Sequence, residues 1–241
     1  MEKTAIIVPT YNEAGNISRL IDALLALDIP GYIVIVDDNS PDRTWEIAAR
    51  RAEQDPRVIL VHRPRKMGLG TAYVAGFRRI LPETDVQLFL TMDADFSHHP
   101  RFIPDVLARA DSADIVIGSR YVPHGRTEAF AFHRRMISRG ANLFAKTLLG
   151  LTPNDCTAGF RCYRREVLES IDLDAIFSHG YSFLVEMLFR CTQSGFRVAE
   201  VPIVYVARSH GMSKISMNEI INTAKTIMRL RFSTGYRGER M

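Results

Sequence analysis

Short β-branched runs alternate with segments of helical periodicity through the first half of the chain, and this alternation limits the possible folds more than any other feature. It is typical of a mainly parallel sheet with helices on both faces. The expected strands are residues 4–9, 32–37, 58–62, 86–92 and 114–118, and the expected helices are 17–25, 45–52, 70–81 and 100–110. We predict an α/β fold, in which Ser40 is the N-cap of the second helix and Pro41 lies in its first turn.

The alternation ends after residue 120. For this half we expect a loop at 123–128, an amphipathic helix at 133–149, helices at 165–171 and 181–194, a strand at 198–206 and a basic helix at 217–231. A length of 241 residues suits one domain. We assign residues 1–231 to that domain, with a lipid-facing or interfacial segment at 120–151, and residues 232–241 to a basic tail.

Several classes of protein are excluded by what the sequence lacks. No stretch reaches the ~18 unbroken apolar residues of a membrane-spanning helix, and the first apolar run is too short for a secretory signal. The three cysteines fit neither a zinc clip nor a disulfide framework, so we expect reduced, buried thiols in a cytoplasmic protein. No GxSxG, HExxH or GxxxxGKS/T motif is present, which argues against serine hydrolases, zincins and P-loop enzymes.

Two segments carry most of the excess positive charge. Residues 120–146 contain six Lys or Arg residues against Glu128 alone, and residues 207–241 contain seven against two acidic residues. Such segments attract phosphate groups, although a solvated surface explains about half of them. We predict no nucleic-acid partner, because the acidic residues described next would repel a polyanion and the basic segments lack interleaved aromatic side chains.

Carboxylates gather where the expected strands end, which is where open parallel sheets bind ligands. The five are Glu13, Asp37, Asp38, Asp93 and Asp95. Like charges at close range repel, so a bound cation is expected there. The Asp-x-Asp pair at 93 and 95 suits Mg2+ or Mn2+ shared with a diphosphate, and a capping or solvated turn is an equally good explanation of the pair alone.

Three other motifs have both a structural and a functional interpretation. Gly68 and Gly70 lack the third glycine of a dinucleotide fingerprint, so we interpret them as a basic loop near phosphate or as a plain helix start. His98 and His99 precede a proline-started helix and are better explained as a turn than as metal ligands.

The third is the segment 133–151, which pairs apolar with basic residues and is either a core helix or an interfacial membrane helix. The aromatic residues just before it favour the membrane interpretation.

Taken together, eight motifs resemble in order and spacing the polyprenol-phosphate (dolichol-phosphate) mannosyltransferases of the inverting family-two glycosyltransferases. They are VPTYNE at 8–13, VDDNSPD at 36–42, GLGTA at 68–72, MDADFSHHP at 92–100, GSRY at 118–121, ISRGAN at 137–142, AGFR at 158–161 and EVP at 200–202. The resemblance covers residues 4–231. It implies a Rossmann-like GT-A fold that transfers mannose from GDP-mannose to the phosphate of a polyprenol or dolichol, with UDP-glucose or another nucleotide sugar as the alternative donor.

The resemblance also implies roles for individual residues. Guanosine would be bound by Pro9, Tyr11, Glu13, Val36 and Asp38. Asp93 and Asp95 would hold Mg2+ or Mn2+ and, with Ala94, the sugar diphosphate; Arg208 and Lys214 would clamp that diphosphate, and Arg120 would also contact the donor. The acceptor phosphate would be bound by Arg120, Arg134 and Arg139. Asp95, Arg120 and Asp155 would be the catalytic residues.

Two departures from the family pattern affect these expectations. Some relatives have Gln where Ser97 stands, so a metal contact at that position is doubtful. Others append membrane-spanning helices, so this chain is expected to reach lipid peripherally, at the cytoplasmic face, or through a membrane-anchoring partner subunit.

The mechanism expected from these residues needs no strong base. A phosphomonoester has a second pKa of about 6, so it arrives ionised and its oxygen can attack the anomeric carbon directly, with inversion. Asp155 would serve as the base only if the acceptor were a sugar hydroxyl.

Overall fold

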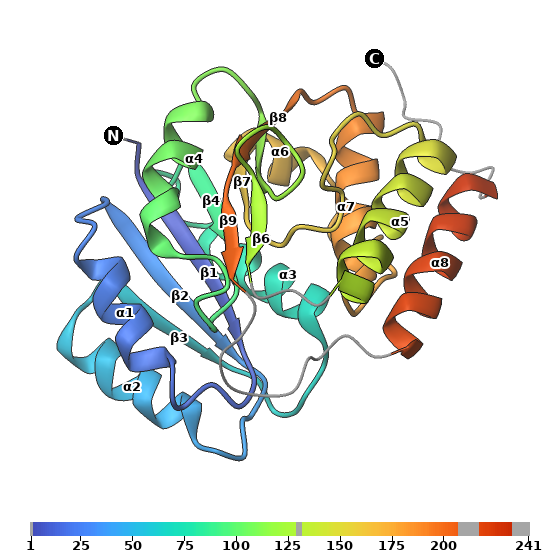
Figure 1. Cartoon of the computed structure of the whole chain (residues 1–241). Helices are drawn as coiled ribbons and strands as arrows, with labels where there is room; N and C mark the ends of the chain where they lie inside the picture. The colour runs from blue at the N-terminus through green and yellow to red at the C-terminus, as the bar shows by residue number, and fades with distance from the viewer. Residues whose placement is uncertain (1, 129–131, 207–216, 233–241) are drawn as a thin grey trace.

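The computed structural model of the protein describes residues 2–128, 132–206 and 217–232, and a seven-stranded sheet runs through the centre of these residues (Figure 1). The strand order is β3-β2-β1-β4-β7-β5-β8. In chain order the strands are β1 (Thr4–Thr10), β2 (Gly31–Asp37), β3 (Val58–His62), β4 (Leu88–Thr91), β5 (Ile115–Ser119), β7 (Arg161–Arg164) and β8 (Val198–Pro202). Only the two pairings of β7, with β4 and with β5, are antiparallel. The prediction of a mainly parallel sheet is confirmed.

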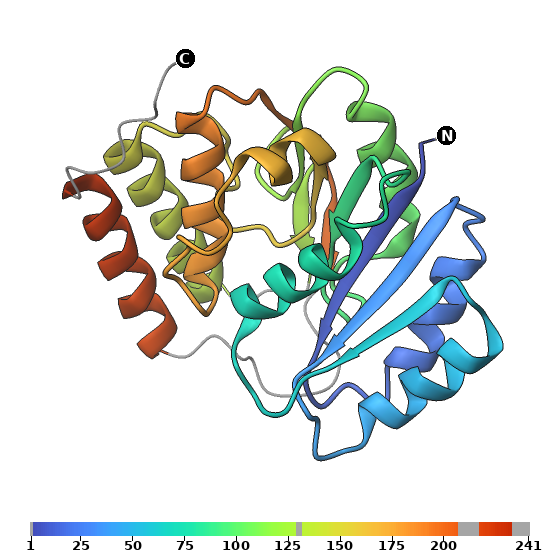
Figure 2. The same ribbon diagram turned by 180° about the vertical axis from the view of Figure 1, so that it is seen from behind.

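Helices cover both faces of this sheet. They are α1 (Ile17–Leu25), α2 (Thr44–Gln54), α3 (Leu69–Ile80), α4 (Ile103–Arg109, after a 3-10 turn at Pro100–Phe102), α5 (Phe132–Leu149), α6 (Arg165–Ser170), α7 (Ser182–Gln193) and α8 (Met217–Phe232). α1, α2 and α4 share one buried core with the sheet, and α3, α6 and α7 share the other. α5 and α8 pack against each other, and α8 also packs on α7, so they extend the second layer outward (Figures 1 and 2).

The helical stripes expected from the sequence account for this packing. Ile17, Leu20, Ile21 and Leu24 are buried on one face of α1, at the spacing of successive helical turns. On the opposite side of the sheet, Gly76 lets α3 approach β1 closely, because a β-carbon there would lie 2.4 Å from Cγ2 of Ile7.

The second helix begins one residue before the expected Trp45, but its predicted N-cap is wrong. α2 begins at Thr44, not directly after Ser40 and Pro41. The Ser40 side chain is used elsewhere: its hydroxyl donates to Oδ2 of Asp37 at 2.7 Å and accepts from the backbone N–H of Asn12 at 3.0 Å. The residue at the N-cap is Arg43, whose side chain makes no capping hydrogen bond, and Oδ1 of the preceding Asp42 accepts from the backbone N–H of Thr44 at 3.1 Å.

Three features of the second half differ from expectation. The expected loop at 123–128 contains β6 (Arg126–Glu128), and the expected strand 198–206 is divided into β8 and β9 (Val204–Val206). β9 leaves the main sheet and pairs in parallel with β6. The third is β7, which the sequence analysis missed.

β7 matters most for the site. Because it runs against its neighbours, its first residue lies where β4 and β5 end, with Arg161 opposite Thr91 and Ile117. The residues just before β7 therefore reach the edge of the sheet that the carboxyl ends of the parallel strands form.

Within the residues that the structure describes, none of the helices combines the length and the apolar character needed to cross a bilayer.

Candidate active site

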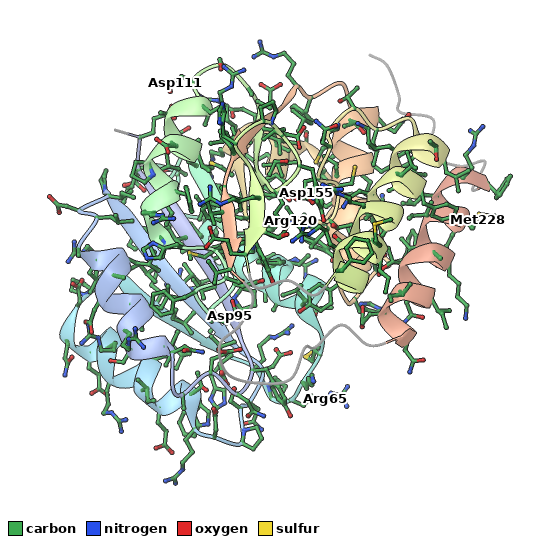
Figure 3. The ribbon with its side chains drawn as sticks, in the orientation of Figure 1. Arg65, Asp95, Asp111, Arg120, Asp155 and Met228 are labelled. Carbon is green, nitrogen blue, oxygen red and sulfur yellow. The ribbon has the colours of Figure 1, made fainter. Side chains whose placement is uncertain are left out.

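The carboxylates expected at the strand ends are brought to one edge of the sheet. β1 pairs in register with β2 on one side and β4 on the other, so the residues that follow these three strands lie close together. Figure 3 shows Asp95 at this edge and Asp111 at the opposite end of the molecule. Arg120 and Asp155 lie next to each other, between Asp95 and α5.

The turn after β4 is held by its own side chains. Oδ1 of Asp95 accepts from both the backbone N–H and the hydroxyl of Ser97, at 3.0 and 2.6 Å. The backbone N–H of Asp93 donates to Nδ1 of His98 at 3.2 Å, and the His98 ring stacks on Phe160 with 5.3 Å between centroids. Ser97 therefore holds the Asp95 carboxylate in this turn.

His98 belongs to this turn as a neutral ring. It is buried, and burial lowers its pKa although Asp93 and Asp95 act in the opposite direction. Because Nδ1 accepts a hydrogen bond, Nε2 carries the proton of the neutral imidazole. Nδ1 of His99 likewise accepts from the backbone N–H of Arg101 at 3.2 Å. Both histidines thus organise the turn, as their position before Pro100 indicated.

The two aspartates suit a hard divalent cation. No group of three or more His, Cys, Asp and Glu side chains is placed to hold a metal ion in the described part of the chain. Mg2+ and Mn2+ do not need such a group, because a diphosphate and water can complete the oxygen shell around one or two carboxylates. Asp93 is 19% exposed at its side chain, whereas the Ala94 side chain is buried and leaves only its backbone for contact with a ligand.

Arg120 and Asp155 form a buried ion pair beside this turn. Nε and Nη2 of Arg120 donate to the two carboxylate oxygens of Asp155 at 2.7 and 2.6 Å, and the Arg120 backbone N–H donates to Oδ2 at 3.0 Å. Burial alone would raise the pKa of the Asp155 carboxyl, but Arg120 outweighs it and holds this pKa below its usual value. Asp155 is therefore ionised, and it fixes the direction of the Arg120 guanidinium.

Neighbouring groups hold the loop that carries Asp155. The Asp155 backbone N–H donates to Oε1 of Glu200 on β8 at 3.0 Å. The fully buried Arg161 donates to the carbonyl oxygens of Cys156 and Leu184, at 2.7 and 2.6 Å. The pair is thus anchored to the sheet and to α7.

A polar network connects the ion pair to α5. Nη2 of Arg120 donates to the Thr157 hydroxyl at 2.9 Å, and Nδ2 of Asn142 donates to the same oxygen at 3.2 Å. Arg120 and Arg139 lie on the ring of Tyr121, 5.2 and 5.8 Å from its centroid. The structure therefore brings together two of the three arginines expected at the acceptor phosphate.

Three other residues that were expected at the site cannot be placed. The Arg134 side chain lies outside the described part of the structure, although its backbone is in α5, and Arg208 and Lys214 lie wholly outside the described residues.

On the other side of the site, Asp38 is held by neighbours that the sequence analysis did not assign. Nε of Arg63 donates to Oδ1 of Asp38 at 2.5 Å, and the backbone N–H groups of Met67 and Gly68 donate to Oδ2 at 2.9 and 3.2 Å. Arg63 directly follows β3, so the rule that singled out the ends of the other strands would also have found it. The glycine loop opens α3, as expected.

The other residues that are expected to bind the guanosine differ in how accessible their side chains are. Pro9 and Val36 face each other across β1 and β2, but the Val36 side chain is fully buried against α3 and offers no surface to a ligand. Tyr11 is half-buried, and Nζ of Lys66 lies 4.3 Å from its ring centroid. Glu13 is buried and accepts from Nδ2 of Asn16 at 2.9 Å.

Comparison with known proteins adds to this geometry. The family described as "Glycosyl transferase family 2" matches residues 5–172. The chain is 46% identical over 214 residues to an undecaprenyl-phosphate mannosyltransferase of Micrococcus luteus, covering 87% of this chain and 86% of that protein. It is 42% identical over 221 residues to a polyprenol monophosphomannose synthase of Mycolicibacterium smegmatis, covering 91% and 83%.

Solved structures of glucosyl-3-phosphoglycerate synthase from Mycobacterium tuberculosis share the fold. The complex with phosphoglyceric acid superposes with a TM-score of 0.68 at 19% identity, covering 94% of this chain and 79% of that one. A second complex, with Mn2+, uridine diphosphate and glucosyl-3-phosphoglycerate, gives 0.67 at 19% identity, covering 95% and 80%.

Proposed function

The chain belongs to glycosyl transferase family 2 and is a glycosyltransferase with the GT-A fold, and on this basis we propose that it transfers mannose from GDP-mannose to the phosphate of a polyprenol. The proposal rests mainly on the 46% identity to an undecaprenyl-phosphate mannosyltransferase, because this similarity extends over most of both chains. The polyprenol monophosphomannose synthase supports the same sugar and the same kind of acceptor.

We assign the donor to the edge formed by β1, β2 and β4. Tyr11, Glu13 and Asp38 lie on the side proposed for the guanosine, and Asp93 and Asp95 lie on the side proposed for the sugar diphosphate. When bound by these two aspartates, Mg2+ or Mn2+ would supply positive charge that neutralises the leaving diphosphate. Ser97 and His98 keep the turn in one conformation, so little reordering is needed when the donor arrives.

Arg120 is the group we propose for the acceptor phosphate. Its guanidinium keeps its charge, and two hydrogen bonds from the guanidinium to Asp155 fix its direction. A fixed cation can bind a phosphate without losing side-chain entropy, and Arg139 on the same tyrosine adds a second charge. Asp155 then acts by positioning Arg120, since a carboxyl with a lowered pKa is a weak proton acceptor.

The reaction balances without a general base. An oxygen of the ionised acceptor phosphate attacks the anomeric carbon, the bond from that carbon to the diphosphate oxygen breaks, and the electron pair leaves with GDP. Attack from the face opposite the leaving group inverts the configuration and gives a β-linked mannosyl phosphate. Positioning and charge neutralisation supply most of the acceleration.

α5 and α8 are the surface that we propose for contact with the membrane. Exposed apolar side chains lie along both helices, among them Phe132, Met136, Ile137, Leu143, Ile221, Met228 and Phe232. Basic side chains on the same helices suit the anionic lipid of a cytoplasmic leaflet. The hydrogen bonds from Arg120 through Thr157 to Asn142 on α5 support this assignment, because they connect the residues proposed for the acceptor site to this helix.

Transfer of radiolabelled mannose tests the reaction. Purified protein, polyprenyl phosphate, GDP-mannose and Mg2+ or Mn2+ should give a labelled lipid that mild acid cleaves. GDP-mannose should also raise the melting temperature more than UDP-glucose does, because a ligand that binds only the folded state stabilises it. No labelled lipid with any polyprenol or metal would refute the proposal, and transfer from UDP-glucose alone would establish the alternative donor.

Flotation with vesicles tests the membrane surface. Vesicles containing anionic lipid should retain the protein, and Leu143→Glu on α5 should release it. Gln54→Glu adds the same charge to α2, on the other side of the sheet, and should have no effect. If both variants bind as the unmodified chain does, then α5 is not the contact. If the unmodified chain itself does not float with the vesicles, attachment through a partner subunit takes the place of this surface.

A further inference from the structure

Tyr73 on α3 is fully buried, and its hydroxyl has no hydrogen-bond partner among the described residues. The ring is well packed, with centroids 5.8 Å from Phe183 and 6.5 Å from Phe77. A phenylalanine would keep this packing and avoid the penalty of burying an unbonded hydroxyl, about 1–3 kcal/mol. Packing therefore does not explain why a tyrosine is present, and a buried polar group of this kind calls for a partner such as water or a ligand.

The surroundings of the hydroxyl indicate what that partner is. A β-carbon on Gly159 would lie 3.4 Å from the Tyr73 hydroxyl, 3.7 Å from Oδ1 of Asp93 and 3.8 Å from Cε1 of His98. Since glycine has no β-carbon, the three groups border a common space. The Gly159 backbone is fixed there, because its carbonyl accepts from the Thr91 hydroxyl at 2.7 Å.

The charges at this space set the direction of hydrogen bonding. Burial and then the charge of Asp93 raise the pKa of Tyr73 well above its usual value, so the hydroxyl remains a donor. The Asp93 carboxylate is an acceptor that borders the same space beside Gly159. The hydroxyl has no direct hydrogen bond among the described residues, and a water between two polar groups can bridge them.

We propose that Tyr73 is a positioning residue for the divalent cation of the donor site: its hydroxyl donates to a water beside Gly159, and this water donates to the Asp93 carboxylate. The inference rests on the proposed metal role of Asp93 and Asp95. Groups that orient a metal ligand from behind commonly change metal affinity about 10- to 100-fold when they are removed. Together Tyr73 and Gly159 would restrict Asp93 to the orientation that faces the cation.

Tyr73→Phe tests this proposal, because a structural role and a positioning role predict different results. If the tyrosine only packs, removing its unbonded hydroxyl raises the melting temperature and leaves metal binding unchanged. If it positions Asp93, Mn2+ binding measured by titration calorimetry in the presence of GDP weakens about 10- to 100-fold, while the melting temperature without metal is unchanged or higher.

Gly159→Ala provides a second, independent variant. Its methyl group meets its neighbours at 3.4 Å or more, so it fits, but it fills the space assigned to the water. Mn2+ binding should weaken as in Tyr73→Phe, and the double variant should be no weaker than the weaker single variant, because both act through the same water. Tyr163→Phe removes the hydroxyl of another buried tyrosine, on β7, and should leave Mn2+ binding unchanged.

Asp95→Asn separates this inference from the proposed function. If Asp95→Asn loses Mn2+ while Tyr73→Phe and Gly159→Ala bind it as the unmodified chain does, the role of Tyr73 is refuted and the metal site stands. If Asp95→Asn retains Mn2+, the metal role fails and the inference fails with it. Equal weakening by Tyr73→Phe and Tyr163→Phe would also overturn the inference, because loss of any buried hydroxyl would then suffice.

Discussion

Replacing Asp155 by asparagine should destabilise the fold strongly, because it leaves a buried cation without its partner. Asp155 is fully buried, and the Arg120 side chain is only 10% exposed, so water screens the pair little. Removing one member of a buried pair costs about 3–5 kcal/mol. Arg120 keeps its hydrogen bond to Thr157 and its contact with the Tyr121 ring, so we take the lower end of this range.

About 3 kcal/mol corresponds to a fall in melting temperature of about 6–12 °C for a domain of this size. Urea unfolding followed by circular dichroism at pH 7 measures the loss directly. Arg120→Gln should cost a similar amount, and the double variant should cost less than the sum of the two single variants, since they share one interaction.

The loss should also depend on pH in a definite direction. Asp155 has a lowered pKa in the folded state, so its contribution is complete above the unfolded pKa of about 4 and disappears as the pH falls through the folded value. The stability difference between the unmodified chain and Asp155→Asn should be constant from pH 7 to 5 and should narrow below pH 4. A loss below about 1 kcal/mol at pH 7, or a difference that widens in acid, would refute the reasoning.

Three further predictions concern the metal site, the packing of α3 and the thiols. Asp95→Asn should lower mannosyl transfer by several orders of magnitude with an unchanged circular dichroism spectrum, and excess EDTA should reproduce this loss in the unmodified enzyme until Mn2+ is restored; activity that survives both treatments would contradict the metal role. Gly76→Ala should cost about 1–3 kcal/mol in urea unfolding, because the new methyl group overlaps Ile7, and an unchanged midpoint would show that α3 can move away from the sheet. Burial raises the pKa of Cys162 and of Cys191 to about 12, so mass spectrometry should find neither alkylated by iodoacetamide at pH 8 unless urea is added.

The first half of the fold was predictable because its elements follow local rules. The stripe of α1 and the β-branched runs of β1 to β3 specify one structure through periodicity alone. β7 was not predictable in this way. It is four residues long, RCYR, and its two end residues are arginines whose side chains bond to backbone carbonyls elsewhere in the fold. A short strand with charged ends has no local signal, and only pairing with β4 and β5 makes it a strand.

The candidate site also has a part that the sequence could predict and a part that it could not. The gathering of Asp38, Asp93 and Asp95 follows from the topology of a parallel sheet, so the sequence could predict it. The partners that hold charged side chains in place come from distant segments: Asp155 is 35 residues from Arg120, and Arg63 is 25 from Asp38. Spacing within a motif does not specify such pairs. The Ser40 cap failed partly for the same reason, since its hydroxyl accepts from the backbone N–H of Asn12, 28 residues away, as well as donating to the nearby Asp37.

The position of β7 has a consequence for how the chain folds as it is synthesised. β4 pairs with β1 on one side, but its other neighbour is made much later. At about 5–20 residues per second, the roughly 70 residues between the end of β4 and the start of β7 take about 4 to 14 seconds to leave the ribosome. During that time one edge of β4 has no neighbouring strand, although all four of its residues are buried in the folded protein. An unpaired apolar strand edge can pair with other chains. We therefore expect chaperones to be needed most in this interval, and slowing translation before residue 161 to increase aggregation.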